Sequence, residues 1–203
     1  MENFEEEYSN NGYKYIAGID EVGRGSLFGD VLACSIIMPL ENRIEGVTDS
    51  KKLSRKKRDY YYELILKNMV AVGIGRVNAN LIDKINIKNA THLAMIKSVK
   101  NLRNKYDKQI RPDLLLIDAE HIEADIEQVS IIKGDDKCYT IACASIVAKV
   151  YRDKLCEIWA KSYPEYGIDK HMGYGTKKHR EMIKLYGPSD MHRKTFVKNS
   201  ENW

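Results

Sequence analysis

The chain has 203 residues, of which 43% are hydrophobic and 31% charged, with a formal net charge of +4. This balance excludes an intrinsically disordered chain, and the length suffices for one sizeable domain with a small appendage. No apolar run approaches the roughly 18 residues that a membrane span needs, and the acidic start MENFEEEYSN lacks the layout of a signal peptide. We therefore expect a cytoplasmic protein with no membrane partner.

Short apolar runs separate the helical patterns along the chain. These runs predict strands over residues 14–19, 30–38, 70–77, 113–117 and 129–132. Helical spacing of apolar residues predicts helices over 55–68, with Ser54 as the N-cap, over 88–106, and over 140–162, before Pro164. We expect residues 1–12 to be flexible and residues 78–87 to be short and irregular, with a helical turn as the alternative. Strands and helices in this order are typical of an α/β fold.

Four acidic residues follow strand-like runs. Asp20 and Glu21 come after the first strand, Asp118 after the fourth, and Asp135 shortly after the fifth. If these strands are neighbours, their ends form one acidic cluster, in which each carboxylate raises the pKa of the others unless cations neutralise them. Carboxylates without Cys or His partners favour Mg²⁺ or Mn²⁺, and two such ions can activate water at a phosphodiester. The alternative is that these acids cap turns or helices.

A glycine-framed arginine follows the first acidic pair. Gly23 and Gly25 permit a close approach of the backbone to a ligand, and Arg24 can present its guanidinium to an anion. Residues 169–198 carry eight Lys/Arg against three acids, together with three histidines. This basic stretch suggests a polyanionic substrate drawn towards the acidic cluster, although a solvated surface that binds nothing is the alternative.

The motifs, taken in order, resemble those of type 2 ribonuclease H (ribonuclease HII). The resemblance spans residues 13–198 and lies in Gly18–Gly25 with Leu27 and Gly29, Asp49–Leu53, Leu115–Asp118, Lys133–Asp135, Ala144–Val150 with Arg152 and Asp153, Gly173–Thr176, and His192, Arg193 and Phe196. It implies a ribonuclease H-like mixed sheet flanked by helices, over residues 13–163. A small C-terminal helical segment that contacts the substrate would follow over residues 164–203.

The resemblance also implies a role for individual residues. Asp20, Glu21 and Asp118 would hold the metal ions, and Asp135 would complete the site. The Gly23–Gly25 element would read the ribose 2′-hydroxyl at a DNA-to-RNA junction. The remaining substrate contacts would be Tyr174 stacking on a deoxyribose, Ser50 and Lys51 binding phosphate, and His192 and Arg193 either contacting the substrate or pinning the last segment.

The function implied is that of an endoribonuclease that hydrolyses the RNA strand of RNA–DNA hybrids. It would also cut on the 5′ side of ribonucleotides embedded in duplex DNA, leaving 5′-phosphate and 3′-hydroxyl ends. One alternative is type 3 ribonuclease H, which usually carries an extra N-terminal domain and lacks the arginine between the glycines. The other is a hybrid-binding module without catalysis. Nothing in the sequence demands more than a monomer.

Four residues near the substrate motifs depart from the family pattern. Ser26 stands where the family often has Pro, Phe28 and Asp30 replace smaller residues, and Met172 replaces a frequent Lys. None of these residues belongs to the acidic set. The departures bear on loop geometry and on substrate affinity, and they leave the reaction class unchanged.

Overall fold

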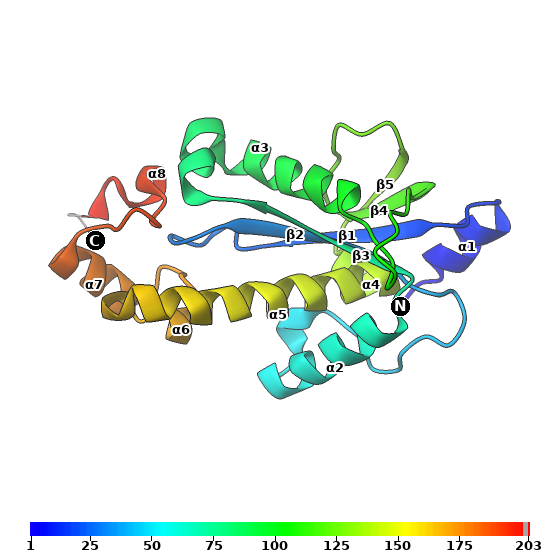
Figure 1. Ribbon diagram of the computed structural model, residues 1–203, viewed down its shortest axis with the longest axis horizontal. Helices are drawn as coiled ribbons and strands as arrows, with labels where there is room; N and C mark the ends of the chain where they lie inside the picture. Colours follow the sequence, from blue (N-terminus) through cyan, green and yellow to red (C-terminus); the bar gives the residue numbers. More distant parts are fainter. Residues whose placement is uncertain (201–202) are drawn as a thin grey trace.

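A five-stranded mixed sheet lies at the centre of the computed structural model, which describes residues 1–200 and 203 (Figure 1). The strand order is β3-β2-β1-β4-β5. The strands are β1 (Ile16–Val22), β2 (Val31–Ile37), β3 (Ala71–Val77), β4 (Leu114–Asp118) and β5 (Glu127–Ile131). β1, β2 and β3 pair as antiparallel neighbours, whereas β4 and β5 run parallel to β1.

Two long helices cover the two faces of this sheet (Figure 1). α3 (Ala79–Lys100) packs on one face and α5 (Tyr139–Ser162) on the other, with α2 (Arg55–Asn68) against the outer side of α5. Gly18 lets α5 approach closely, because a Cβ atom there would lie 2.4 Å from the carbonyl carbon of Thr140. The expected α/β fold with a mixed, helix-flanked sheet is confirmed. No helix in the described part of the chain is both long and apolar enough to cross a membrane.

The remaining elements are short and lie mostly at the ends of the molecule. They are α1 (Phe4–Asn10), the 3-10 turn η1 (Ser50–Lys52), α4 (Gly134–Lys137), the 3-10 turn η2 (Pro164–Tyr166), α6 (Ile168–His171), α7 (Lys177–Tyr186) and α8 (Lys194–Val197). The C-terminal elements pack around Phe28, which is fully buried in the connection between β1 and β2. Residues 201 and 202 of the expected C-terminal segment lie outside the described residues.

The N-terminal residues differ from the expectation of flexibility. Residues 4–10 form α1, and Glu5 within it is only 3% exposed. Its carboxylate accepts hydrogen bonds from the backbone N–H and the hydroxyl of Thr140, both at 2.7 Å, and pairs with Arg43 at 3.1 Å. Glu5 therefore caps the first turn of α5, a role that depends on a partner far away in the sequence.

The segment after β3 is more regular than expected. Of the two predictions for residues 78–87, irregular or a helical turn, the structure agrees with helix, which begins at Ala79 with the Asn78 side chain as its cap. Asn86 interrupts it with a φ of +65°, so two helical pieces meet at a kink. The expected helix end at residue 106 is also wrong, because α3 ends at Lys100.

Candidate active site

Asp20 and Glu21 lie inside β1, because the strand continues to Val22 and does not end at residue 19 as expected. Consecutive strand residues point to opposite faces, so Asp20 lies on the α5 face and Glu21 on the α3 face. Asp20 is 6% exposed, and its Oδ1 accepts the backbone N–H of Glu21 at 2.7 Å. Both side chains nevertheless line the same pocket, of about 240 Å³, where β1 ends.

The parallel pairing of β1 with β4 brings the third acid to this pocket. Ile19 pairs with Ile117, so the next residue, Asp118, lies at the level of Asp20 and lines the pocket with it. Asp118 Oδ1 accepts the backbone N–H of Gly134 at 2.7 Å, which ties β4 to the start of α4. Asp135 follows on α4, is 6% exposed and raises the pKa of Asp118 through its charge.

The three pocket carboxylates carry more negative charge than their surroundings neutralise. Burial raises the pKa of Asp20 well above its usual value, and the charges of Glu21 and Asp118 add to this effect. Burial likewise raises the pKa of Glu21, against the lowering effect of Arg24, and raises that of Asp118. A cation bound in the pocket would lower these pKa values, because its positive charge stabilises the ionised carboxylates.

The donor set fits a divalent cation in its chemistry, since it consists of carboxylate oxygens without cysteine or histidine. Each of the four acids already accepts a hydrogen bond from the protein. Asp20 accepts from the Glu21 N–H and Asp118 from the Gly134 N–H, whereas Glu21 accepts from Arg24 at 3.4 Å and Asp135 from the Lys51 ammonium at 2.9 Å. Within residues 1–200 and 203, no group of three or more such side chains is already arranged to hold a metal ion. The carboxylates would therefore have to exchange these protein donors for the cation.

The two glycines around Arg24 occupy different environments. Gly23 has a φ of +88°, and a Cβ atom there would lie 2.3 Å from Nε of Arg152. Around Gly25, in contrast, no atom lies within 4 Å of such a Cβ, so its backbone is open to a ligand. The Arg24 guanidinium pairs with Glu120 at 2.7 Å and with Glu21 at 3.4 Å, and it lines the pocket with both glycines.

Arg152 joins this loop to the segment that carries Tyr174. Its guanidinium is fully buried and lies 5.8 Å from the centroid of the Tyr174 ring. It donates to the carbonyl groups of Phe28 and Met172, at 3.1 and 2.9 Å, and to the Ser26 hydroxyl at 2.9 Å. Three of the residues that depart from the family pattern thus belong to one hydrogen-bond network around Arg152.

Asp30, the fourth residue that departs from the family pattern, and the phosphate-binding candidates Ser50 and Lys51 also have partners within the protein. Asp30 pairs with Arg76 at 2.7 Å. Ser50 is 4% exposed and shares a hydrogen bond of 2.9 Å with the hydroxyl of Ser145, so it forms part of the pocket wall. The side chain of Lys51 is 76% exposed even though its ammonium reaches Asp135, which leaves it accessible to a phosphate.

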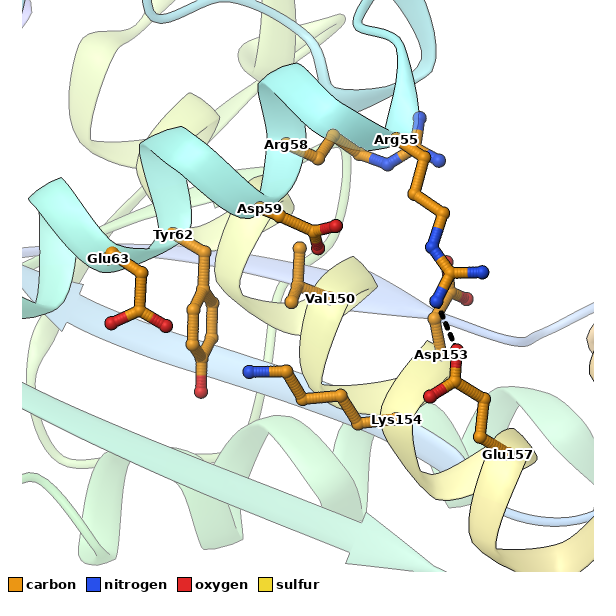
Figure 2. A pocket seen from close by; sticks show the side chains of 9 residues that line it. All are labelled: Arg55, Arg58, Asp59, Tyr62, Glu63, Val150, Asp153, Lys154 and Glu157. Atoms are coloured by element: carbon orange, nitrogen blue, oxygen red, sulfur yellow. Dashed lines mark hydrogen bonds and ion pairs between the residues drawn. The ribbon is translucent and has the colours of Figure 1, made fainter.

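A second groove lies between α2 and α5 (Figure 2). Arg55 pairs with Glu157 across it, and the Lys154 ammonium lies 4.1 Å from the centroid of the Tyr62 ring. Arg58 donates to the carbonyl groups of Ser50 and Leu53, at 3.1 and 2.6 Å. The contacts across the groove hold α2 against α5. The hydrogen bonds of Arg58 also attach the turn that carries Ser50 and Lys51 to α2.

Two roles are expected from the sequence for His192 and Arg193, contact with the substrate or pinning of the last segment. Both side chains are fully buried. Arg193 donates to the carbonyl groups of Gly29 and Arg24, at 3.0 and 2.8 Å, and the His192 ring meets that of Phe28 edge-on at 4.9 Å. The alternative role is the one observed, since both side chains pin the last segment to the loop after β1. Charge and sequence position do not distinguish these roles, because they depend on burial in the folded chain.

Two residues at the site were not predicted from the sequence, Ser145 in the pocket wall and Glu120 beside Arg24. Ser145 lies one helical turn before Lys149 on α5, and both line the pocket. Lys149 also pairs with Asp153 at 2.7 Å, one turn further along the same helix. Glu120 follows Asp118 by two residues and contacts Arg24. Ser145 could have been predicted from its helical spacing from Lys149 within the family motif. The position of Glu120 close to Asp118 in the sequence does not indicate that it pairs with Arg24.

Comparison with known proteins gives matches along nearly the whole chain. Residues 17–199 match the sequence model of the family described as Ribonuclease HII. The ribonuclease HII of Alkaliphilus oremlandii is 56% identical over 188 residues, which are 93% of each protein. That of Bacillus subtilis is 50% identical over 197 residues, which are 97% of this chain and 75% of the relative.

Among solved structures, the crystal structure of ribonuclease H2 from Pyrococcus horikoshii OT3 has a TM-score of 0.75 to this fold at 24% identity. The similarity covers 93% of this chain and 98% of that one, and it supports the fold. The family is established by the sequence matches, and the matched span, residues 17–199, contains the acidic residues and the Gly-Arg-Gly element. This chain belongs to the ribonuclease HII family and is an endoribonuclease.

Proposed function

We propose that this ribonuclease hydrolyses the RNA strand of RNA–DNA hybrids and cuts on the 5′ side of a ribonucleotide embedded in duplex DNA. The observation that carries the proposal is one shared pocket. It is lined by the three carboxylates of Asp20, Glu21 and Asp118, by the Gly23–Gly25 element and by Tyr174. Groups able to promote hydrolysis thus lie beside a backbone that is open to a nucleic-acid strand.

The carboxylates serve to hold divalent cations, Mn²⁺ or Mg²⁺, as in the metal-dependent family to which the chain belongs. Asp20, Glu21 and Asp118 would hold the cation, and Asp135 would add a fourth carboxylate once Lys51 leaves it. When bound, a pair of such ions supplies an activated water and charge stabilisation for displacement at phosphorus, which leaves 5′-phosphate and 3′-hydroxyl ends. Ser145, hydrogen-bonded to Ser50, lies beside Asp20 and offsets part of the increase that burial causes in the pKa of this carboxyl.

The Gly23–Gly25 element and Tyr174 select the position of the cut. Gly25 leaves its backbone exposed, which permits a hydrogen bond to the ribose 2′-hydroxyl that distinguishes RNA from DNA. Tyr174, backed by the buried Arg152, offers an aromatic face for the neighbouring sugar. Lys51 provides a cation for a phosphate next to the cut.

We also propose that the enzyme is cytoplasmic and acts as a monomer. One chain supplies all the carboxylates that line the pocket, so no second copy is needed to complete it. The substrates are RNA–DNA hybrid duplexes and DNA that contains ribonucleotides. Both substrates are polyanions, which the basic stretch of residues 169–198 would attract towards the cation site.

The test is cleavage of a labelled DNA duplex that contains one ribonucleotide, with Mg²⁺ or Mn²⁺ and with excess chelator. With the label at the 5′ end of the cut strand, we expect a single labelled product with a 3′-hydroxyl end, no cleavage in chelator, and a loss of at least about a thousandfold in kcat for Asp20→Asn. Asp125→Asn is the matched control, because Asp125 is exposed and lies outside the pocket. Binding of the duplex without metal-dependent cleavage would favour a non-catalytic module, and undiminished cleavage in chelator would refute the role of the carboxylates.

A further inference from the structure

Arg24 is held by a chain of charged and polar groups that continues away from the acidic pocket. Oε1 of Glu120 lies 2.7 Å from Nη1 of Arg24, and Oε2 of the same carboxylate lies 2.8 Å from Nε2 of His92. His92 belongs to α3, whereas Glu120 follows the end of β4. The chain thus connects the arginine to two elements of the scaffold.

The main chain of Arg24 has its own anchors. Its carbonyl group accepts a hydrogen bond of 2.8 Å from the buried Arg193, and the neighbouring Gly23 packs directly on Arg152. The side chain is 41% exposed and is not fixed by these contacts. Its orientation therefore depends on its two acidic neighbours, Glu21 and Glu120.

Glu120 is the stronger of these two anchors. Its contact with Arg24 is 2.7 Å, against 3.4 Å for Glu21, and Glu21 faces the pocket where cations would compete for its oxygens. The second oxygen of this carboxylate is held by His92 at 2.8 Å, so the Glu120 side chain is fixed from both sides. Only 16% of the Glu120 side chain is exposed, and a charge-assisted hydrogen bond there is screened less than one at the surface.

We propose that Glu120, held by His92, is a positioning residue that orients Arg24 and thereby sets the preference of the enzyme for a single ribonucleotide within DNA. This inference rests on the proposed function, because it takes the Gly23–Gly25 element as the reader of the ribose. Without Glu120, the flexible Arg24 side chain would turn towards Glu21 and the acidic pocket. It would then no longer be fixed beside the backbone that meets the nucleic acid.

The effect depends on the substrate. An embedded ribonucleotide offers one 2′-hydroxyl, so that a single alignment with the Arg24 loop decides whether it is cut. A long RNA–DNA hybrid offers a 2′-hydroxyl at every nucleotide of its RNA strand, and many registers are productive. Loss of the orientation of Arg24 should therefore reduce kcat/KM for the embedded ribonucleotide and leave the hybrid nearly unaffected.

The experiment compares kcat/KM for the two substrates in wild type, Glu120→Ala, His92→Ala and the control Glu123→Ala. Glu123 is an exposed acid on the same loop, outside the chain that holds Arg24. We expect the ratio of embedded to hybrid kcat/KM to fall about tenfold for Glu120→Ala, which corresponds to about 1.4 kcal/mol. His92→Ala should lower it about threefold, and Glu123→Ala should leave it unchanged.

A double-mutant cycle with Arg24→Ala distinguishes positioning from a separate effect of charge. If Glu120 acts through Arg24, Glu120→Ala changes the ratio no further when Arg24 is already absent. Glu120→Gln, which keeps the shape and one acceptor, should restore part of the ratio and serves if the alanine variant folds poorly. An unchanged ratio in all Glu120 and His92 variants, or additive effects in the cycle, would overturn this inference but not the proposed function. A wild-type enzyme that does not cut the embedded ribonucleotide would overturn the proposed function and this inference with it.

Discussion

Gly23 and Gly25 lie two residues apart and have opposite requirements. Gly23 adopts a φ of +88° and leaves no room for a Cβ atom, because Nε of Arg152 would lie 2.3 Å from it. Arg152 is fully buried and bonded to several loop acceptors, so it cannot move aside at low cost. Neither the positive φ nor the lack of space applies to Gly25, whose missing side chain instead leaves the backbone free for a ligand.

We predict that Gly23→Ala lowers the free energy of unfolding by about 2–3 kcal/mol, because it combines a left-handed backbone with a clash in the interior. Gly25→Ala should change it by no more than about 0.5 kcal/mol, while it reduces cleavage of an embedded ribonucleotide. Urea unfolding of the two variants measures the difference. Equal stabilities would contradict the packing of Gly23 against Arg152.

The residues whose role follows from the local sequence pattern could be predicted. Asp20, Glu21 and Asp118 each follow or end an apolar run, and the structure places all three in one pocket. Residues whose role depends on burial were not found in this way. His192 and Arg193 have side chains typical of nucleic-acid contacts, but they are fully buried.

At the scale of elements, two histidines fasten α7 to the loop that follows it. His192 Nδ1 accepts the backbone N–H of Ser189 at 2.9 Å, so its Nε2 carries the proton and points to Nε2 of His179 at 3.2 Å. His179 then donates from Nδ1 to the carbonyl group of Tyr174 at 2.9 Å. This ordered chain requires both rings to be neutral, and it secures the backbone of the tyrosine that lines the active site.

The stability of the C-terminal elements should therefore fall in acid. Burial lowers the pKa of His179 to about 4 and that of His192 to about 3, whereas an unfolded histidine takes up its proton near 6.5. Between pH 6.5 and about 4 the unfolded state binds more protons, so stability decreases as the pH falls, by at most about 1.4 kcal/mol per pH unit for each ring.

The measurement is urea unfolding of wild type and His192→Gln over this range of pH. The variant lacks one titrating ring, so the difference between the two unfolding free energies should shift in favour of the variant as the pH falls. This difference isolates the histidine from the buried carboxylates, whose raised pKa values give the opposite slope. Parallel curves would show that His192 is not held neutral.

Elements were predictable where the signal was local. The Ser54 cap and the apolar spacing placed α2 at the bounds that the structure has, and Ser54 accepts the N–H of Lys57. The helix α1 was missed, because it is stabilised by the distant contact of Glu5 with Thr140. The long helix was predicted to begin at residue 88 and not at Ala79, because Asn86 interrupts α3 with a kink.

At the scale of the whole molecule, strand order brings the acids together. The chain separates Asp20 from Asp118 by almost a hundred residues, yet the parallel pairing of β1 with β4 makes them neighbours. Periodicity alone does not determine which strands pair, so the family resemblance supplied this step. The resulting cluster opposes folding while it is unneutralised, because buried like charges repel each other.

This opposition predicts how the whole molecule responds to metal. Asp20→Asn should raise the free energy of unfolding of the metal-free protein by roughly 1 kcal/mol, since it removes a buried charge and keeps the acceptor for the Glu21 N–H. Saturating Mn²⁺ should raise the Tm of wild type by roughly 5 °C, because the folded state alone binds the cation. The same addition should shift Asp20→Asn much less, whereas the exposed control Asp125→Asn should follow wild type. Thermal unfolding with chelator and with Mn²⁺ measures all three, and equal shifts in wild type and Asp20→Asn would show that Asp20 does not hold the ion.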